Sequence, residues 1–149
     1  ISVARQNSSS ENIKSSVYKI GSTITGVDFN TSVSTFRKNI TVPSGYLIKI
    51  VDKNGKEITS GNIGTGTKVV LYKGENAVKT NTVVIKGDPS GDGKVTSVDV
   101  LYAKRHTVKT YVLEGVYFDA ADINGDGKIT SVDRLDMQRH TVKAYEIKN

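Results

Sequence analysis

Residues 88–99, DPSGDGKVTSVD, and residues 122–133, DINGDGKITSVD, are near-copies of one acidic twelve-residue segment. Each copy carries oxygen-bearing side chains at positions 1, 3, 5, 9 and 12 and a glycine at position 6. Calcium is a hard cation that takes roughly six to eight oxygen ligands. A twelve-residue loop supplies them from these positions and from the carbonyl of position 7, around a sharp glycine turn. The two segments therefore predict two calcium-binding loops.

The predicted ligands share one spacing in both loops. In the first loop they are Asp88, Ser90, Asp92, the carbonyl of Lys94, Thr96 and Asp99. In the second loop they are Asp122, Asn124, Asp126, the carbonyl of Lys128, Thr130 and Asp133. Position 12 is Asp in both loops where the usual EF-hand has Glu, so the helix must start closer to the ion or a water must replace one oxygen. Ser90 is a neutral and weaker ligand than Asn or Asp, so we expect weaker calcium binding in the first loop. The alternative is a pair of metal-free Asx-type turns, which two matched copies make the weaker interpretation.

The similarity of the two segments continues beyond the loops. Residues 88–111 and 122–145 are identical at 16 of 24 positions, at an offset of 34 residues. An internal repeat of this kind indicates repeated structural units, and two copies suggest a two-fold arrangement. Acidic loops alternate with helical segments from residue 87 onward, so we expect an all-α domain there.

The repeated stretches GDPSGDGKVTSVDVLYAKRHTV and ADINGDGKITSVDRLDMQRHTV resemble the duplicated segment of dockerin domains. The resemblance covers about residues 87–149 and rests on tandem F-hands, which are calcium loops with an exiting but no entering helix, and on Asp at position 12. It implies two Ca²⁺ ions and, as the partner, a cohesin module of a scaffoldin or cell-surface protein. The domain would then attach secreted enzymes or scaffoldins to a cellulosome-like complex for polysaccharide degradation. The implied location is extracellular, or at the cell surface through the partner.

The same resemblance implies that loop positions 10 and 11 and helix positions 17, 18 and 22 bind the cohesin. These are Ser97, Val98, Lys104, Arg105 and Lys109 in the first copy, and Ser131, Val132, Gln138, Arg139 and Lys143 in the second. Helical spacing independently groups Val98, Leu101, Arg105 and Val108, and likewise Val132, Leu135, Arg139 and Val142. Two alternatives stay open: the apolar members are core residues, or Ser97 and Ser131 are helix N-caps.

Residues 17–86 have a different pattern, which predicts a small β-rich module. Short runs rich in β-branched and aromatic residues predict strands at 17–20, 46–51, 68–72 and 82–86. One helix is expected at 32–38, with Thr31 as its N-cap. The stretch resembles, more loosely, the immunoglobulin-like sandwich or X modules that precede dockerins. Residues 1–16, rich in Ser and Asn, are expected to be a linker or a frayed first strand.

Composition excludes several classes of protein. The chain has no Cys, so it has no disulfides or thiolate metal sites. Residues 1–86 carry 12 Lys/Arg against 5 Asp/Glu, but the lysines are scattered singly, which does not favour nucleic-acid binding. No apolar run approaches the ~20 residues needed to cross a membrane. The paired acids all belong to the loops, while Glu57 and Glu75 are isolated, so we expect a non-catalytic module. The resemblance to dockerins implies that it is an appendage of a larger secreted enzyme or scaffoldin.

Three further possibilities were weighed. A calcium sensor or buffer needs paired helices and a Met-rich groove, and this chain has one Met. The β-rich module would bind carbohydrate if Tyr18, Tyr46 and Tyr72 formed a platform, although they are expected to fill the sheet. His106 and His140 occupy equivalent positions without catalytic partners, which predicts packing on the helix surface.

Overall fold

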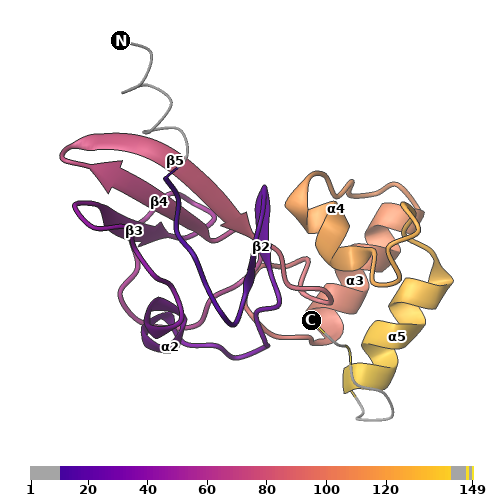
Figure 1. Cartoon of the computed structure of the whole chain (residues 1–149). Helices are drawn as coiled ribbons and strands as arrows, with labels where there is room; N and C mark the ends of the chain where they lie inside the picture. The colour runs from indigo at the N-terminus through magenta and orange to yellow at the C-terminus, as the bar shows by residue number, and fades with distance from the viewer. Residues whose placement is uncertain (1–10, 142–146, 148) are drawn as a thin grey trace.

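A computed structural model describes residues 11–141, 147 and 149, and the first half of this part forms one mixed sheet (Figure 1). Its strands are β1 (Lys19–Ile20), β2 (Thr23–Thr25), β3 (Leu47–Val51), β4 (Lys68–Lys73) and β5 (Asn76–Val83). Their order across the sheet is β1-β2-β5-β4-β3. Strand β2 runs parallel to β5, and the other neighbours are antiparallel. Strand β5 begins six residues earlier than the sequence predicted and ends at Val83.

Helix α2 (Val33–Lys38) packs its buried side chains Val33 and Phe36 into the core of the sheet. Its N-cap is Ser32, whose hydroxyl accepts a hydrogen bond from the Thr35 amide at 3.2 Å, so the expected cap Thr31 is wrong. Side chains three residues apart share one side of a helix, and here that side packs into the core beside the sheet. The described strands therefore form one sheet covered by a helix and do not show the expected immunoglobulin-like sandwich.

The second half of the described chain contains three helices. They are α3 (Ser97–Thr107), α4 (Val116–Ala121) and α5 (Ser131–Thr141), and α3 packs against α5. The core between them contains Ala103 and Met137, which are equivalent positions of the two repeats, both fully buried. Helix α4 leads into the second acidic loop and was not predicted. None of the helices in the described part of the chain is long and apolar enough to cross a membrane.

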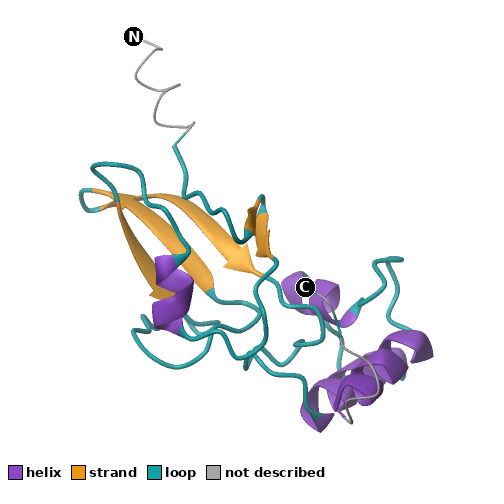
Figure 2. Cartoon of the chain, turned by 60° about the horizontal axis from the view of Figure 1, so that its bottom comes forward, coloured by secondary structure: helices purple, strands orange, loops and turns teal. Residues whose placement is uncertain are grey.

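The two halves meet around Gly87, and helices α3, α4 and α5 group at one end of the sheet, apart from α2 (Figure 2). The Phe29 ring packs against both cores and lies edge-on to His140, with ring centroids 5.0 Å apart. The Gly87 amide donates to the Ala120 carbonyl at 2.7 Å. The Lys86 amide donates to Asn149 Oδ1, also at 2.7 Å. The first acidic loop therefore begins at the junction and not on a free linker.

Candidate calcium loops and docking face

The fold brings the predicted carboxylates into two separate clusters. One contains Asp88, Asp92 and Asp99, and the other contains Asp122, Asp126 and Asp133. Within each cluster the carboxylate oxygens lie within 4.8 Å of one another. The first and last acid of each cluster are buried and the middle one is exposed. Oxygen donors of this number and spacing fit a divalent cation such as Ca²⁺.

The carboxylate at position 1 organises each loop by accepting backbone hydrogen bonds. Asp88 Oδ2 accepts from the Gly93 amide at 2.8 Å, and Asp122 Oδ2 accepts from the Gly127 amide at the same distance. Both glycines have positive φ, 80° and 84°. This conformation suits glycine because it lacks a Cβ. The sharp turn predicted at position 6 is therefore present in both loops.

Position 12 joins each loop to the helix that follows it. Asp99 Oδ1 accepts from the Ser90 amide at 3.0 Å, and Asp99 Oδ2 accepts from the Thr96 amide at 2.8 Å. Thr96 is the N-cap of α3, and its side chain forms a capping box with Asp99. The short Asp side chain therefore reaches the loop because the helix begins immediately beside it. Ser97 is the first residue of α3 and not its N-cap, so the alternative that Ser97 caps the helix is wrong.

The second loop repeats this arrangement. Asp133 Oδ1 accepts from the Ile123 amide and Asp133 Oδ2 from the Thr130 amide, both at 2.9 Å. Thr130 also accepts from the Val132 amide at 3.2 Å, and Ser131 opens α5 as Ser97 opens α3. Two copies of one sequence motif have therefore folded to closely similar hydrogen bonds, although Asp99 Oδ1 accepts from position 3 of its loop and the shortest hydrogen bond to Asp133 Oδ1 comes from position 2.

The remaining predicted ligands lie at the edges of the two clusters. The Ser90 hydroxyl donates to Asp88 Oδ1 at 3.2 Å, and Asn124 Oδ1 accepts from the Asp126 amide at the same distance. The backbone amides of Lys94 and Lys128 donate to the position-5 carboxylates at 2.9 and 3.0 Å. All twelve predicted ligand residues therefore belong to the two loop structures.

Burial makes the first cluster unfavourable without a cation. Desolvation raises the pKa of Asp88 from its ordinary value to about 7, against the lowering effect of hydrogen bonds from the Thr65 and Gly93 amides. The charge of Asp99 raises the Asp88 pKa further, and burial likewise raises the pKa of Asp99. Buried carboxylates that repel one another are stabilised by a bound cation. The electrostatics of the first loop therefore also fit Ca²⁺.

The predicted docking stripe lies on the exposed side of α3 and α5. The exposed fractions of its apolar members are 48% for Val98, 43% for Leu101, 60% for Val108, 52% for Val132 and 42% for Leu135. Their polar neighbours are also exposed: Ser97, Lys104, Arg105, Lys109, Ser131, Gln138 and Arg139. Val142 and Lys143 lie outside the described residues. The apolar members are therefore not core residues, because Ala103 and Met137 on the opposite stripe fill the core.

The two histidines have a structural role that the sequence pattern indicated only as packing. His106 Nδ1 accepts a hydrogen bond from the Leu113 amide at 2.9 Å, and His140 Nδ1 accepts from the Ile147 amide at 3.1 Å. Leu113 and Ile147 are both buried core residues. Each histidine thus accepts a hydrogen bond from a buried residue seven positions further along the chain. The shared seven-residue separation within each copy is the sequence signal for this contact.

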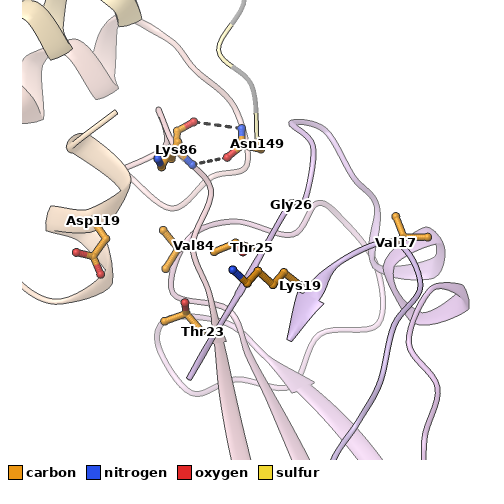
Figure 3. Close-up of a pocket in the computed structure, with 9 residues that line it drawn as sticks. All are labelled: Val17, Lys19, Thr23, Thr25, Gly26, Val84, Lys86, Asp119 and Asn149. Atoms are coloured by element: carbon orange, nitrogen blue, oxygen red, sulfur yellow. Dashed lines mark hydrogen bonds between the residues drawn. The ribbon is translucent and has the colours of Figure 1, made fainter. Parts of the chain in front are cut away.

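A cavity of roughly 620 Å³ lies beside the junction (Figure 3). Strands β1 and β2, the segment after β5, helix α4 and the end of the chain contribute to its lining, which includes Lys19, Lys86, Asp119 and Asn149. Among the described lining residues Asp119 is the only one with an acidic side chain.

The three tyrosines considered as a sugar-binding platform differ in solvent exposure. Tyr18 is buried and stacks on Phe36, with ring centroids 5.1 Å apart. Tyr46 and Tyr72 are partly exposed, and each has a lysine ammonium group over its ring. A three-ring platform is therefore not formed.

These features define a class of protein domain: a duplicated acidic loop and helix, with an exposed apolar and basic stripe on the paired helices. The family model described as Dockerin type I domain matches residues 86–140. This match confirms the resemblance to dockerin domains found in the repeated sequence. The preceding single sheet is consistent with a small β-rich module. None of the curated proteins compared with the chain matches it.

Proposed function

We propose that this chain is a non-catalytic docking module that binds two Ca²⁺ ions and, through α3 and α5, a cohesin module. Docking would assemble secreted enzymes or scaffoldins into an extracellular, cellulosome-like complex. The dockerin match over residues 86–140 supports the class of partner. The β-rich module and the docking segment would together be an appendage of a larger secreted polypeptide.

One observation carries the proposal: five large apolar side chains lie exposed in two equivalent rows beside arginines. Val98, Leu101 and Val108 stand with Arg105 on α3, while Val132 and Leu135 stand with Arg139 on α5. Exposed apolar patches with polar rims mark protein interaction sites, and arginine is enriched among the residues that dominate binding energy. Val98, Arg105, Val132 and Arg139 of these rows are positions that the dockerin resemblance implies for cohesin contact. Helical spacing groups Leu101, Val108 and Leu135 with them.

The acidic loops would hold the metal. The twelve ligand residues of the two loops would supply the oxygens, and bound calcium would supply the positive charge that offsets the buried carboxylates. The loops precede α3 and α5 directly, through Asp99 and Asp133 at the first turn of each helix. Metal binding would therefore fix where these helices begin, and with them the docking rows.

The decisive experiment measures cohesin affinity by calorimetry with a panel of purified cohesin modules. We expect binding in excess calcium and none in excess chelator. The double variant Leu101→Asp with Leu135→Asp should lower affinity by about two orders of magnitude, because charges would replace central apolar contacts. If the two rows are alternative binding faces, each single variant should bind nearly as tightly as the unmodified chain.

Leu47→Asp is the matched control, since Leu47 is equally apolar and more exposed but lies on β3. It should leave cohesin affinity unchanged. Circular dichroism in calcium should show the same helical signal for every variant. Cohesin binding that survives both chelation and the double variant would disprove the proposal. A chain that folds without calcium and exposes new apolar surface on adding it would instead indicate a sensor.

A further inference from the structure

The first acidic loop packs directly against a buried segment of the β-rich module, residues 63–66. The Thr65 amide donates to Asp88 Oδ2 at 3.0 Å, so this module supplies a hydrogen bond to a predicted metal ligand. Thr65 itself is fully buried, and its hydroxyl bonds both the amide and the carbonyl of Ile85, at 3.0 and 3.2 Å. The donor is therefore held in place by hydrogen bonds within the β-rich module.

Around this bond the two backbones approach as closely as glycine allows. A Cβ at Gly64 would collide with the carbonyl of Gly91, and a Cβ at Gly93 would collide with the carbonyl of Ile63. The Gly93 carbonyl also accepts from the Asn30 amide at 2.9 Å. Positions 4 and 6 of the first loop are therefore in contact with the β-rich module through their main chain.

A lysine from the same module adds a contact to position 3. Lys53 Nζ donates to the Ser90 carbonyl at 2.6 Å. The positive charge of Lys53 lies beside a site for a cation. Substituting Lys53 would therefore remove a hydrogen bond to the loop and also remove repulsion between the ammonium group and the bound cation. These two effects oppose each other, and the glycine contact therefore offers the cleaner test.

The second loop has less of this support among the described residues. Lys86 Nζ donates to the Ile123 carbonyl at 3.3 Å, but a Cβ at Gly127 would meet nothing within 4 Å, and one at Gly125 would meet only Lys86 Nζ, at 4.0 Å. Asn124 at position 3 is exposed, whereas Ser90 at the same position of the first loop is buried. Two loops of nearly identical sequence therefore have different surroundings.

We propose that residues 63–66 are a positioning element for the first calcium loop, so that calcium binding there is coupled to docking of the β-rich module more strongly than calcium binding in the second loop is. The inference rests on the proposed calcium binding. Contacts that favour the calcium-binding conformation of a loop reduce the conformational freedom that it loses when it binds its ligand. By thermodynamic linkage, calcium in the first loop must stabilise the contact between the modules by the same factor. This support compensates for the neutral ligand Ser90.

The test is Gly64→Ala in the full chain, with calcium affinity measured by calorimetry. Asp126→Ala isolates the first loop and Asp92→Ala isolates the second, because each removes one carboxylate from the other loop. In the Asp126→Ala background, Gly64→Ala should weaken calcium binding about tenfold or more, the scale of a lost hydrogen bond to a charged group. In the Asp92→Ala background it should change nothing.

Gly21→Ala is the matched control, because its new Cβ meets only the Thr23 carbonyl at an ordinary 3.7 Å. It should leave both affinities unchanged. If Gly64→Ala does not fold, Thr65→Val is used instead. It keeps the amide, loses the hydroxyl bridge to Ile85, and should give a smaller loss confined to the first loop.

The outcomes separate the two proposals. A chain that binds no calcium would overturn the proposed function, and this inference with it. Two calcium sites that Gly64→Ala leaves unchanged, or weakens equally, would overturn only the inference. Loss of stability without a selective loss of affinity would assign residues 63–66 a purely structural role and would likewise overturn it.

Discussion

At the residue scale, Asp88 links the stability of the metal-free chain to pH. Burial raises its pKa to about 7, whereas in the unfolded chain it titrates near 3.8. Between these values the folded chain binds more protons than the unfolded chain. The contribution of Asp88 to stability is therefore greatest in acid and falls as pH rises, by at most about 1.4 kcal/mol per pH unit. In excess chelator, the helical circular dichroism of residues 87–149 should be weaker at pH 7.5, where these residues are expected to unfold, than at pH 5.

Calcium should change this dependence, because the metal requires the ionised carboxylate. We expect calcium-saturated samples to lose little or no stability over the same pH range. Asp88→Asn is the control, since an amide does not titrate, and it should flatten the metal-free profile. Metal-free stability that instead increases from pH 5 to 7.5 would contradict the burial of an uncompensated Asp88 carboxyl.

Residue types and spacing were sufficient to predict which acids gather in the two loops. All six acids at positions 1, 5 and 12 lie where the twelve-residue pattern requires. The helix caps were less predictable, because Thr and Ser stand next to each other and both are good N-caps. Thr96 was selected by the reciprocal contact with Asp99. The bond from Thr65 to Asp88 spans 23 residues, and no local pattern predicts it.

At the element scale, a histidine in each long helix of the repeat accepts a hydrogen bond from a buried residue that follows the helix. His106→Ala would leave the Leu113 amide without its acceptor, and His140→Ala would do the same to Ile147. An unsatisfied buried amide costs about 1–3 kcal/mol. Denaturant unfolding in saturating calcium should therefore show each variant destabilised by that amount.

Asparagine offers a conservative comparison, because its side-chain oxygen can accept the same hydrogen bond as Nδ1. His106→Asn should lose less stability than His106→Ala. Equal losses for the two variants would assign the effect to packing of the ring alone and not to the hydrogen bond.

Strongly patterned elements were predictable, and short or weakly patterned ones were not. β3 and β4 lie within one residue of their predicted bounds because apolar and β-branched residues are concentrated there. β2 has three residues and is stabilised by pairing with the distant β5. Helix α4 begins after Gly115 without a side-chain cap, so its sequence carries no start signal.

At the scale of the whole molecule, calcium removal should affect the two halves differently. The helical half has a small core and two acidic clusters, whereas the sheet has a larger core of its own. Metal binding free energy contributes to folding where the site does not exist in the unfolded chain. We therefore expect chelation to unfold residues 87–149 and leave the sheet folded, as a loss of helical circular dichroism with retained dispersion of sheet amide resonances.

The double variant Asp92→Ala with Asp126→Ala is the control, because it removes a carboxylate from each loop without any chelator. It should resemble the chelated chain whether or not calcium is added. A helical signal that persists unchanged in both samples would show that the helices fold independently of metal.

The close approach of the first loop to the β-rich module has a consequence for how the two repeats can diverge. Gly125 needs only to adopt a φ of 72°, a left-handed conformation that asparagine also tolerates. Gly91 has a similar φ of 83°, but a Cβ there would also lie 2.7 Å from the Thr65 carbonyl. A residue larger than glycine at position 4 therefore fits the second loop but not the first. Two repeats that arose from one duplicated segment can therefore accept different substitutions, because each one packs against different neighbours.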